Sequence, residues 1–255
     1  MLGQLLPFAP VPRTKRRRLD PAEGRRSLLD AGRQLAYDHP AGEPLANIRI
    51  TEVAEVAGVT IGAFYHYWES QDDYRLDLLR HLLEPDRFDT WSGTGSLIEP
   101  LIDQGAALTE VVRQATQAGF EALCDSPDQR VSMALWAQDE AESLRLMRSM
   151  YHQVNDAWAA LYLGVLAHYG REPRPPFDGD SIALVLTALT DGLLVRHSLE
   201  PDRLEGGLSA GEGPEDWSLV SCVVLALLPT MTRPVEGPAI ERSDLWQTVD
   251  RLLDR

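Results

Sequence analysis

The sequence is poor in cysteine, with two residues in 255, and it has no long uninterrupted apolar run. Cys124 and Cys222 are too few for a disulfide framework and lack the spacing of zinc ligands, which favours a reducing compartment. The densest apolar stretch, residues 219–228, is much shorter than the roughly 20 residues that a membrane-spanning helix needs. Residues 1–12 lack the pattern of a secretory signal. We therefore expect a cytoplasmic protein that makes no membrane contact.

Motifs of metal binding and catalysis are also scarce. The six histidines include no pair at the helical spacing of a metal site, and no phosphate-binding glycine loop occurs, so we expect no cofactor. Residues 207–211 match the pentapeptide around a hydrolase nucleophile, but they lie in a glycine-rich loop and not at a strand-to-helix turn. We therefore expect that the protein is not an enzyme. A hydrolase that uses Ser209 is the alternative.

The charge of the chain is unevenly distributed. The net charge of −15 opposes contact with nucleic acid unless basic residues gather in one place. They gather at the N-terminus, where residues 1–33 carry eight basic and three acidic groups, so the other 222 residues sum to −20. This asymmetry predicts a flexible basic arm, residues 1–19, on an acidic body. Within the arm, Arg16, Arg17 and Arg18 are candidates for contacts with a phosphate backbone.

Proline and glycine clusters divide the remaining chain into segments that have the 3.6-residue period of helices. No segment shows the alternation typical of strands, so the sequence predicts an all-α protein. Residues 84–100 and 171–176 are expected to be connections, and residues 205–213 a loop. Helices are predicted at about 21–38, 50–57, 61–68, 71–83, 101–123, 128–138, 140–169, 181–199, 215–229 and 244–253.

Residues 50–83 have the spacing of a helix-turn-helix: a short helix, a turn at 58–60, a second short helix and a capped third one. The string from Ile50 to Trp68 resembles the DNA-binding signature of the tetracycline-repressor (TetR) family of bacterial regulators. Residues 70–74 with Leu78 resemble the family's next helix, and residues 187–194 more distantly resemble its penultimate helix. The resemblance covers residues 21–83 and implies that the chain binds double-stranded DNA.

The resemblance assigns roles within the signature. Thr60 can cap the second short helix, whose N-terminal amides favour a phosphate. Phe64 and Trp68, four residues apart, are expected in the core. The alternative for Tyr65 and Tyr67 is that they also pack there. By resemblance, the groove-facing positions are Ile61, Gly62, Ala63, Tyr65 and His66, and Tyr67 contacts a phosphate.

Some residues depart from the family pattern. Gln71 stands where the family usually has a phosphate-binding lysine, and it can donate a hydrogen bond without a charge. Arg49 stands where the family often has a Ser or Thr cap, so either Asn47 or Thr51 caps the helix, or Arg49 itself reaches a phosphate. Residues 45–83 have a net charge of −3, so the basic arm must supply much of the attraction to DNA, and we expect it to enter a minor groove. The alternative is a protein-binding adaptor that has lost specific DNA binding.

The family implies a helix-turn-helix domain at residues 20–83 and a larger effector and dimerisation domain at residues 84–255. Residues of about 181–199 and 215–229 resemble the helices that form a homodimer interface, with monomer core as the alternative. Aromatic and thioether side chains with a few polar tips are typical of a pocket for a small apolar or aromatic effector, although plain core is an alternative for each. The candidates are Phe120, Met133, Trp136, Met147, Tyr151, Asn155, Trp158 and Tyr162. Together these features predict a ligand-responsive repressor that binds a palindromic operator as a dimer.

Overall fold

The protein is described here by a computed structural model that covers residues 20–38, 45, 48–137, 140–205 and 217–235. This part of the chain is almost entirely helical, which confirms the predicted fold class. The elements in chain order are α1 (Pro21–Asp38), α2 (Ile50–Val56), α3 (Ile61–Phe64), α4 (Gln71–Leu82), the 3₁₀ helix η1 (Pro85–Phe88), α5 (Trp91–Asp103), α6 (Leu108–Cys124), α7 (Pro127–Ala137), α8 (Ala141–His168), β1 (Arg171–Pro173), α9 (Gly179–Leu199), α10 (Pro201–Glu205), α11 (Leu219–Met231) and β2 (Thr232–Pro234).

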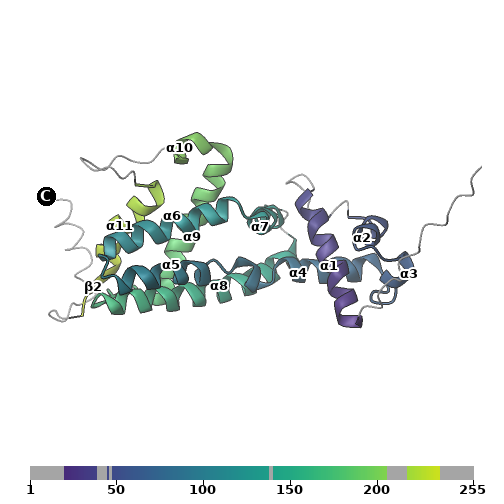
Figure 1. Ribbon diagram of the computed structural model, residues 1–255, viewed down its shortest axis with the longest axis horizontal. Helices are drawn as coiled ribbons and strands as arrows, with labels where there is room; N and C mark the ends of the chain where they lie inside the picture. The colour runs from purple at the N-terminus through teal and green to yellow at the C-terminus, as the bar shows by residue number, and fades with distance from the viewer. Residues whose placement is uncertain (1–19, 39–44, 46–47, 138–139, 206–216, 236–255) are drawn as a thin grey trace, which may run out of the picture.

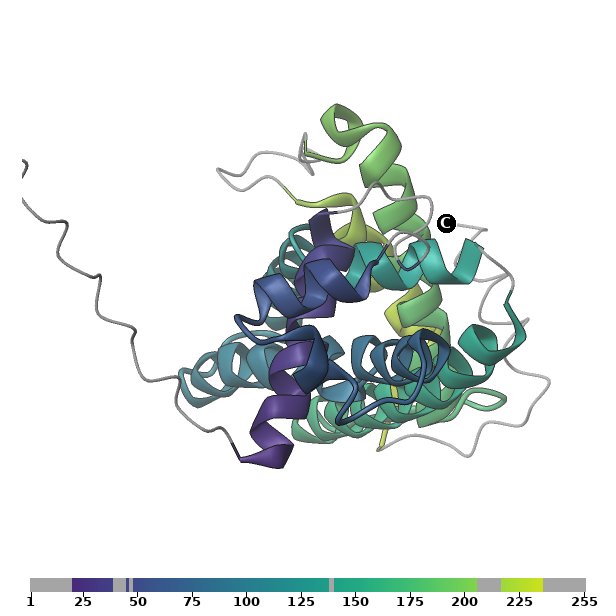
Figure 2. The same cartoon turned by 90° about the vertical axis from the view of Figure 1, so that its right-hand side faces the viewer.

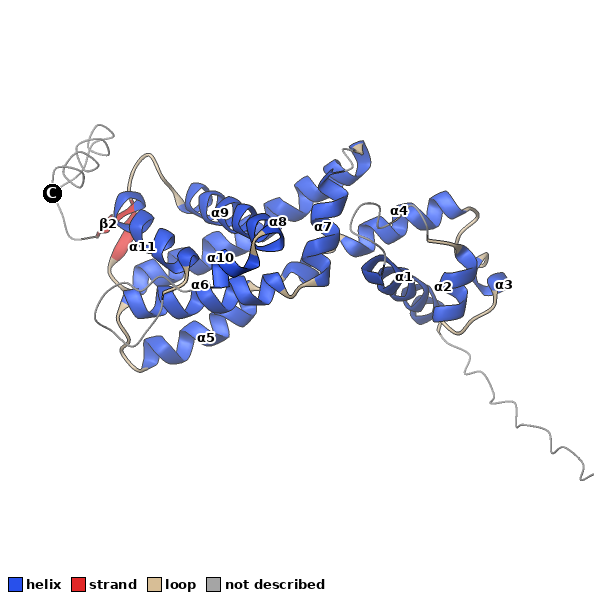
Figure 3. Ribbon diagram, turned by 90° about the horizontal axis from the view of Figure 1, so that it is seen from above, coloured by secondary structure: helices blue, strands red, loops and turns tan. Residues whose placement is uncertain are grey.

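The molecule is elongated, with a small head at one end and a larger helical body at the other (Figure 1). The head consists of α1, α2 and α3 around the first part of α4, and α4 leads from it towards the body. In the body, α8 packs along α9, while α6 packs along α5 and α11. Helix α7 lies between the two parts, as the view from above shows (Figure 3).

Capping residues set the starts of α1 and α4. The carboxylate of Asp20 accepts a hydrogen bond from the Ala22 N–H at 2.9 Å, just before Pro21 opens α1. Ser70 and Asp73 form a reciprocal capping box at α4, with both bonds at 3.1 Å. Between α2 and α3 the chain turns at Gly58, whose φ of 67° favours glycine.

The head core is built on close contact between α1 and α4. A Cβ atom at Gly32 would lie 2.0 Å from the Tyr74 hydroxyl, so only glycine lets the two helices approach this far. The Tyr74 hydroxyl donates to the Leu28 carbonyl at 2.9 Å. The hydrophobic cluster of the head continues into α7 and α8 through residues such as Leu135 and Met150, so it crosses the predicted domain boundary at residue 83.

Residues 84–100 form helices instead of the expected connection. They contain η1 and most of α5, and α5 packs against α6 and α8. The prediction is wrong because the glycines at 93 and 95 have low helix propensity, yet α5 continues through both of them and through Pro100. The predicted single helix at 101–123 is divided instead at Gly105, where φ is 74°.

Other differences are smaller. The helix predicted at 61–68 is α-helical only at Ile61–Phe64 and continues as turns to Tyr67. Strand β1 pairs with β2 in an antiparallel ribbon that the sequence pattern did not reveal. Helix α11 continues past Pro229 to Met231. The helix predicted at 244–253 and most of the loop predicted at 205–213 lie outside the described residues.

Helix α9 is, within the described ranges, the one helix long and apolar enough to cross a membrane. Its inner side packs on α8, α6 and α11. Contacts between helices therefore account for the apolar residues on that side.

Candidate DNA-recognition helix and effector pocket

Helix α3 and the turn after it present one set of side chains to solvent and bury another. The Thr60 hydroxyl caps the helix by accepting a hydrogen bond from the Ala63 N–H at 3.3 Å. Ile61 and Tyr65 are 45% and 54% exposed, although both side chains are large and hydrophobic. Gly62 and His66 are also exposed and Ala63 is half-buried, whereas Phe64 and Trp68 are buried. The end of the molecule that carries α1 to α3 faces the viewer in Figure 2.

A cluster of aromatic rings supports this segment from below. The ring centroids of Phe64, Trp68 and Tyr74 lie 4.9–5.1 Å from one another. Tyr65 contacts the edge of Phe64 at 5.5 Å while most of its surface stays exposed. Tyr67 is half-buried, and a Cβ atom at Gly24 would lie 2.3 Å from its hydroxyl. Tyr67 therefore packs against the first turns of α1, so its position is fixed by the head core.

Asp77 of α4 ties the cluster to α1. Its carboxylate accepts hydrogen bonds from the Trp68 indole N–H at 2.7 Å, from Arg25 and, at 3.3 Å, from Arg80. The Arg25 guanidinium also lies 5.5 Å from the centroid of the Trp68 ring. Burial alone would raise the pKa of Asp77, but the bonds from Trp68 and Arg25 hold that pKa below its usual value. Arg25 is thus engaged within the head.

The two departures from the family signature have defined positions. The Gln71 side-chain amide donates to the Ile48 carbonyl at 3.1 Å, so it joins the start of α4 to the segment before α2. Arg49 is the N-cap residue of α2, makes no side-chain capping bond and is exposed. Asn47, Arg16, Arg17 and Arg18 lie outside the described residues.

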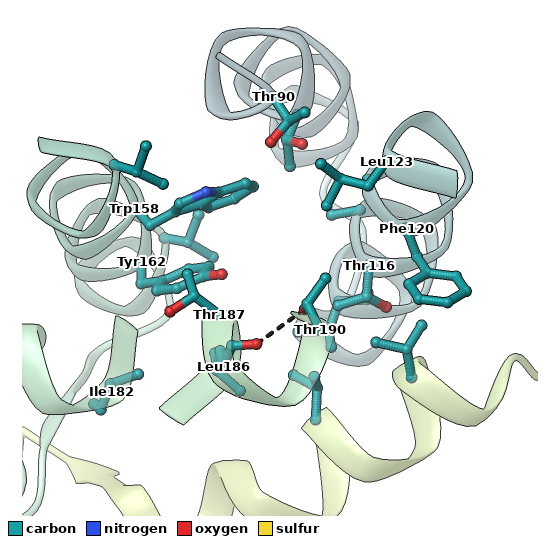
Figure 4. A pocket seen from close by; sticks show the side chains of 18 of the residues that line it. Thr90, Thr116, Phe120, Leu123, Trp158, Tyr162, Ile182, Leu186, Thr187 and Thr190 are labelled. Carbon is teal, nitrogen blue, oxygen red and sulfur yellow. Dashed lines mark hydrogen bonds between the residues drawn. The ribbon is translucent and has the colours of Figure 1, made fainter. Parts of the chain in front are cut away.

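The body encloses a cavity of about 150 Å³ among α5, α6, α8, α9 and α11. Four of the predicted pocket residues line it: Phe120, Tyr151, Trp158 and Tyr162. Trp158 and Tyr162 stack with ring centroids 5.3 Å apart, and Figure 4 shows them across the cavity from Phe120.

The other four predicted pocket residues lie elsewhere. Met147 is buried on α8 one turn before Tyr151, in the hydrophobic cluster that the body shares with the head. Trp136 is 66% exposed at the end of α7, and Met133 of the same helix does not line the cavity. The Asn155 amide donates to the carboxylate and the carbonyl of Asp180. These residues resemble the pocket residues in type, but two of them lie on α7 and the two on α8 are engaged elsewhere, so none lines the cavity.

A carboxyl group in the pocket wall escaped the sequence analysis. Asp191 of α9 accepts hydrogen bonds from the Tyr151 hydroxyl at 3.0 Å and from the Gln129 amide at 3.3 Å. All three residues line the cavity. Burial raises the pKa of Asp191, because a buried carboxylate loses its hydration. The signal that was available is an acidic residue in the middle of an otherwise apolar helix.

The outer side of α9 is an exposed apolar stripe. Leu184 and Leu199 are 59% and 68% exposed, and Val185 and Val195 are also exposed. Ala188 and Gly192, both small, lie exposed between them. The opposite side of the same helix lines the cavity with Ile182, Leu186, Thr187 and Thr190.

No family model matches the chain. The HTH-type transcriptional regulator BetI of Agrobacterium fabrum is 26% identical over 181 residues, which cover 69% of this chain and 77% of BetI. A putative TetR-family regulator from Rhodococcus sp. has a TM-score of 0.47 and 19% identity, covering 70% of this chain and 89% of its own. A TetR-family regulator from Agrobacterium tumefaciens has a TM-score of 0.46 and 13% identity, covering 71% and 90%. The chain has the signature at residues 50–68, a helix-turn-helix head and a curated relative in BetI. It is therefore similar to the TetR family of transcriptional regulators, which are not enzymes.

Proposed function

We propose that this protein is a ligand-responsive transcriptional repressor that binds a palindromic operator as a homodimer and takes a small apolar or aromatic effector in the body. The observation that carries the proposal is the exposed surface of α3. Large side chains at Ile61 and Tyr65 remain in solvent on a segment whose other side is fixed by Phe64 and Trp68. Exposed hydrophobic groups on a rigid support are typical of a binding surface.

The exposed residues suit a DNA major groove. The Thr60 cap engages the Ala63 N–H, so the amides of Ile61 and Gly62 are the ones that can meet a phosphate, and the small Gly62 allows close approach of the backbone. Tyr65 and His66, in the turn after α3, supply hydrogen-bonding groups for base edges in the groove. Ile61 and Ala63 add apolar contacts, for example with thymine methyl groups.

Charge for the phosphate backbone must come from outside α3. Arg49 is exposed beside the head and Tyr67 has its hydroxyl near the first turns of α1. Gln71 can reach a phosphate only in addition to its bond with Ile48. Because Arg25 is engaged with Asp77, we assign the larger electrostatic contribution to Arg16, Arg17 and Arg18 of the arm.

A second copy of the chain is the partner that the α9 stripe fits. Pairing of two stripes about a two-fold axis would cover Leu184, Val195 and Leu199. Helix α11 contributes less exposed surface, since it packs on α6 and α9 and buries Val220 and Val224. Two heads held by this interface can contact two half-sites of an operator.

The first experiment is a mobility-shift assay with duplex DNA from either side of the coding region. We expect a discrete complex that survives excess nonspecific competitor DNA and weakens as salt increases. A shuffled sequence of the same length serves as the control. Failure to bind any flanking fragment specifically, with the protein folded and dimeric, would instead favour the adaptor hypothesis.

A further inference from the structure

The carboxyl group of Asp191 lacks a cationic partner among the described residues that contact it. Its two hydrogen-bond donors, the Tyr151 hydroxyl and the Gln129 amide, are both neutral. A carboxylate has about four acceptor positions, so these two bonds leave capacity for a further donor. Since Asp191 lines the cavity, a bound molecule can approach it. Burial also raises the pKa of Asp191, as expected for an acid without a nearby cation.

Threonine side chains add acceptors to the same wall. The hydroxyls of Thr187 and Thr190 donate to the carbonyls of Ala183 and Leu186, each at 2.9 Å (Figure 4 shows the second bond). On α6, the Thr116 hydroxyl donates to the Val112 carbonyl at 2.7 Å and lies 2.8 Å from the Ser221 hydroxyl, so its bonds are made within the protein. Because the hydroxyl protons of Thr187 and Thr190 are engaged within α9, these two oxygens keep the capacity to accept a hydrogen bond from a ligand. The polar groups on α9 therefore favour a ligand that donates hydrogen bonds.

The apolar part of the cavity selects the shape of the ligand. The stacked rings of Trp158 and Tyr162 provide an aromatic wall, and their faces attract a cation as well as another ring. A volume of about 150 Å³ is that of the engineered cavity that is known to bind benzene, so one aromatic ring is a suitable size.

We propose that the cavity binds a small arylalkyl ammonium ion, with its ring against Trp158 and Tyr162 and its N–H groups donating to Asp191. This inference rests on the effector site of the proposed function and specifies its ligand class. The ammonium group supplies the positive charge that Asp191 lacks, and a charge-assisted hydrogen bond is stronger than a neutral one. Benzoate-like acids do not fit, because they would place a second negative charge beside Asp191.

The test is isothermal titration of the full-length protein with four probes that share one ring: 2-phenylethylamine, 2-phenylethanol, 3-phenylpropanoate and benzyltrimethylammonium. At pH 7 we expect the amine to bind at least tenfold more tightly than the other three. The neutral alcohol lacks the charge, the acid has the opposite charge, and the quaternary ion lacks an N–H donor. Equal or tighter binding of any of them, or no binding of the amine at millimolar concentration, overturns the proposal.

Two variants locate the contact. Asp191→Asn keeps the shape and the bond from Tyr151 but removes the charge, so we expect amine affinity to fall at least tenfold while alcohol affinity stays within threefold. Asp156→Asn, an exposed position of α8, is the matched control and leaves both affinities unchanged. Circular dichroism and the dimer mass show whether Asp191→Asn is folded. An unchanged amine affinity in that folded variant overturns the assignment.

The outcome is separable from the proposed function. Specific binding to flanking DNA without any amine binding leaves the repressor proposal intact and removes only the ligand class. Amine binding that requires Asp191, in a protein that ignores DNA, supports the ligand class and removes the repressor.

Discussion

Adjacent residues of the recognition segment have opposite surroundings. Phe64 is fully buried in the head core, whereas Tyr65 is 54% exposed. The helical period predicts this division, because Phe64 and Trp68 are four residues apart and Tyr65 is rotated away from them. The same reasoning does not determine how far Tyr67 is buried, since its contact with Gly24 depends on where α1 crosses the head.

Substitution of Tyr65 or His66 by alanine tests the groove contact. We expect each variant to keep its fold and dimer mass and to lose specific affinity by tenfold or more, since each good base contact contributes about 1–3 kcal/mol. Fluorescence anisotropy with the operator fragment measures the change. His168→Ala, at an exposed position of α8, should bind DNA like the wild type. Retained affinity in both head variants would remove these residues from the interface.

Sequence reasoning misjudges the role of Asp77. Counted by charge alone, it is one of six acidic groups that repel DNA from residues 45–83. In the structure its charge is matched by Arg25 and Arg80, and it fixes the Trp68 indole. Arg80 lies three residues along the same helix and is visible from local spacing, but Arg25 and Trp68 come from outside α4, so local spacing could not have revealed them.

Asp77→Asn tests this role through stability. We expect the variant to unfold more easily at pH 7 by about 1–3 kcal/mol, because two charge-assisted hydrogen bonds lose their charge. The pKa of Asp77 is lowered from 3.8 in the folded state. Its contribution is therefore present above that value and is lost as the pH falls below it. Urea titrations at pH 7 and pH 3 should show a difference from wild type that shrinks at the lower pH. A difference that stays constant contradicts the role of the charge.

Helices with caps and a clear apolar side were predictable, whereas the segment between head and body was not. Helices α1, α2 and α4 begin within a residue or two of the expected positions. Pro21 marks the start of α1 and Ser70 that of α4. Helix α5 was missed because its glycines and Pro100 outweigh its apolar period in a local analysis, and packing on α6 and α8 decides the outcome.

The basic arm is an element that lies outside the described residues, and its role is open to a direct test. Deletion of residues 1–18 should reduce operator affinity at low salt and flatten the dependence of log K on log salt. Each phosphate contact contributes about 0.9 to that slope, so loss of three arginine contacts should lower it by roughly 3. An unchanged slope would show that the arm is merely solvated.

The apolar stripe of α9 is tested by a charge at one of its exposed leucines. Leu184→Glu should shift the protein from dimer to monomer, because two-fold pairing brings the new carboxylate close to its symmetry copy or buries it. Light scattering after size exclusion at micromolar concentration measures the mass. Val235→Glu, an exposed apolar position after β2, should stay dimeric. A wild-type protein that is already monomeric contradicts the interface.

At the scale of the whole molecule, the head and the body share one hydrophobic cluster and two polar joints. The Tyr37 hydroxyl of α1 donates to the Asp128 carboxylate of α7 at 2.5 Å. The Nε2 atom of buried His81 of α4 lies 2.9 Å from the Asp30 carboxylate of α1. The Arg87 Nε–H donates to the backbone carbonyl of His81 at 2.6 Å. A shift of α7 or α8 can therefore be passed to α1 and α4.

Helix α9 carries the cavity wall on one side and the outward stripe on the other. On the proposed roles of its two sides, a movement of α9 that follows effector binding also changes the affinity between the two subunits. By linkage, dimerisation then changes the affinity for the effector by the same factor. The apparent strength of effector capture would differ between dilute and concentrated protein. An effector titration repeated over a hundredfold range of subunit concentration would expose this reciprocity even in the absence of DNA.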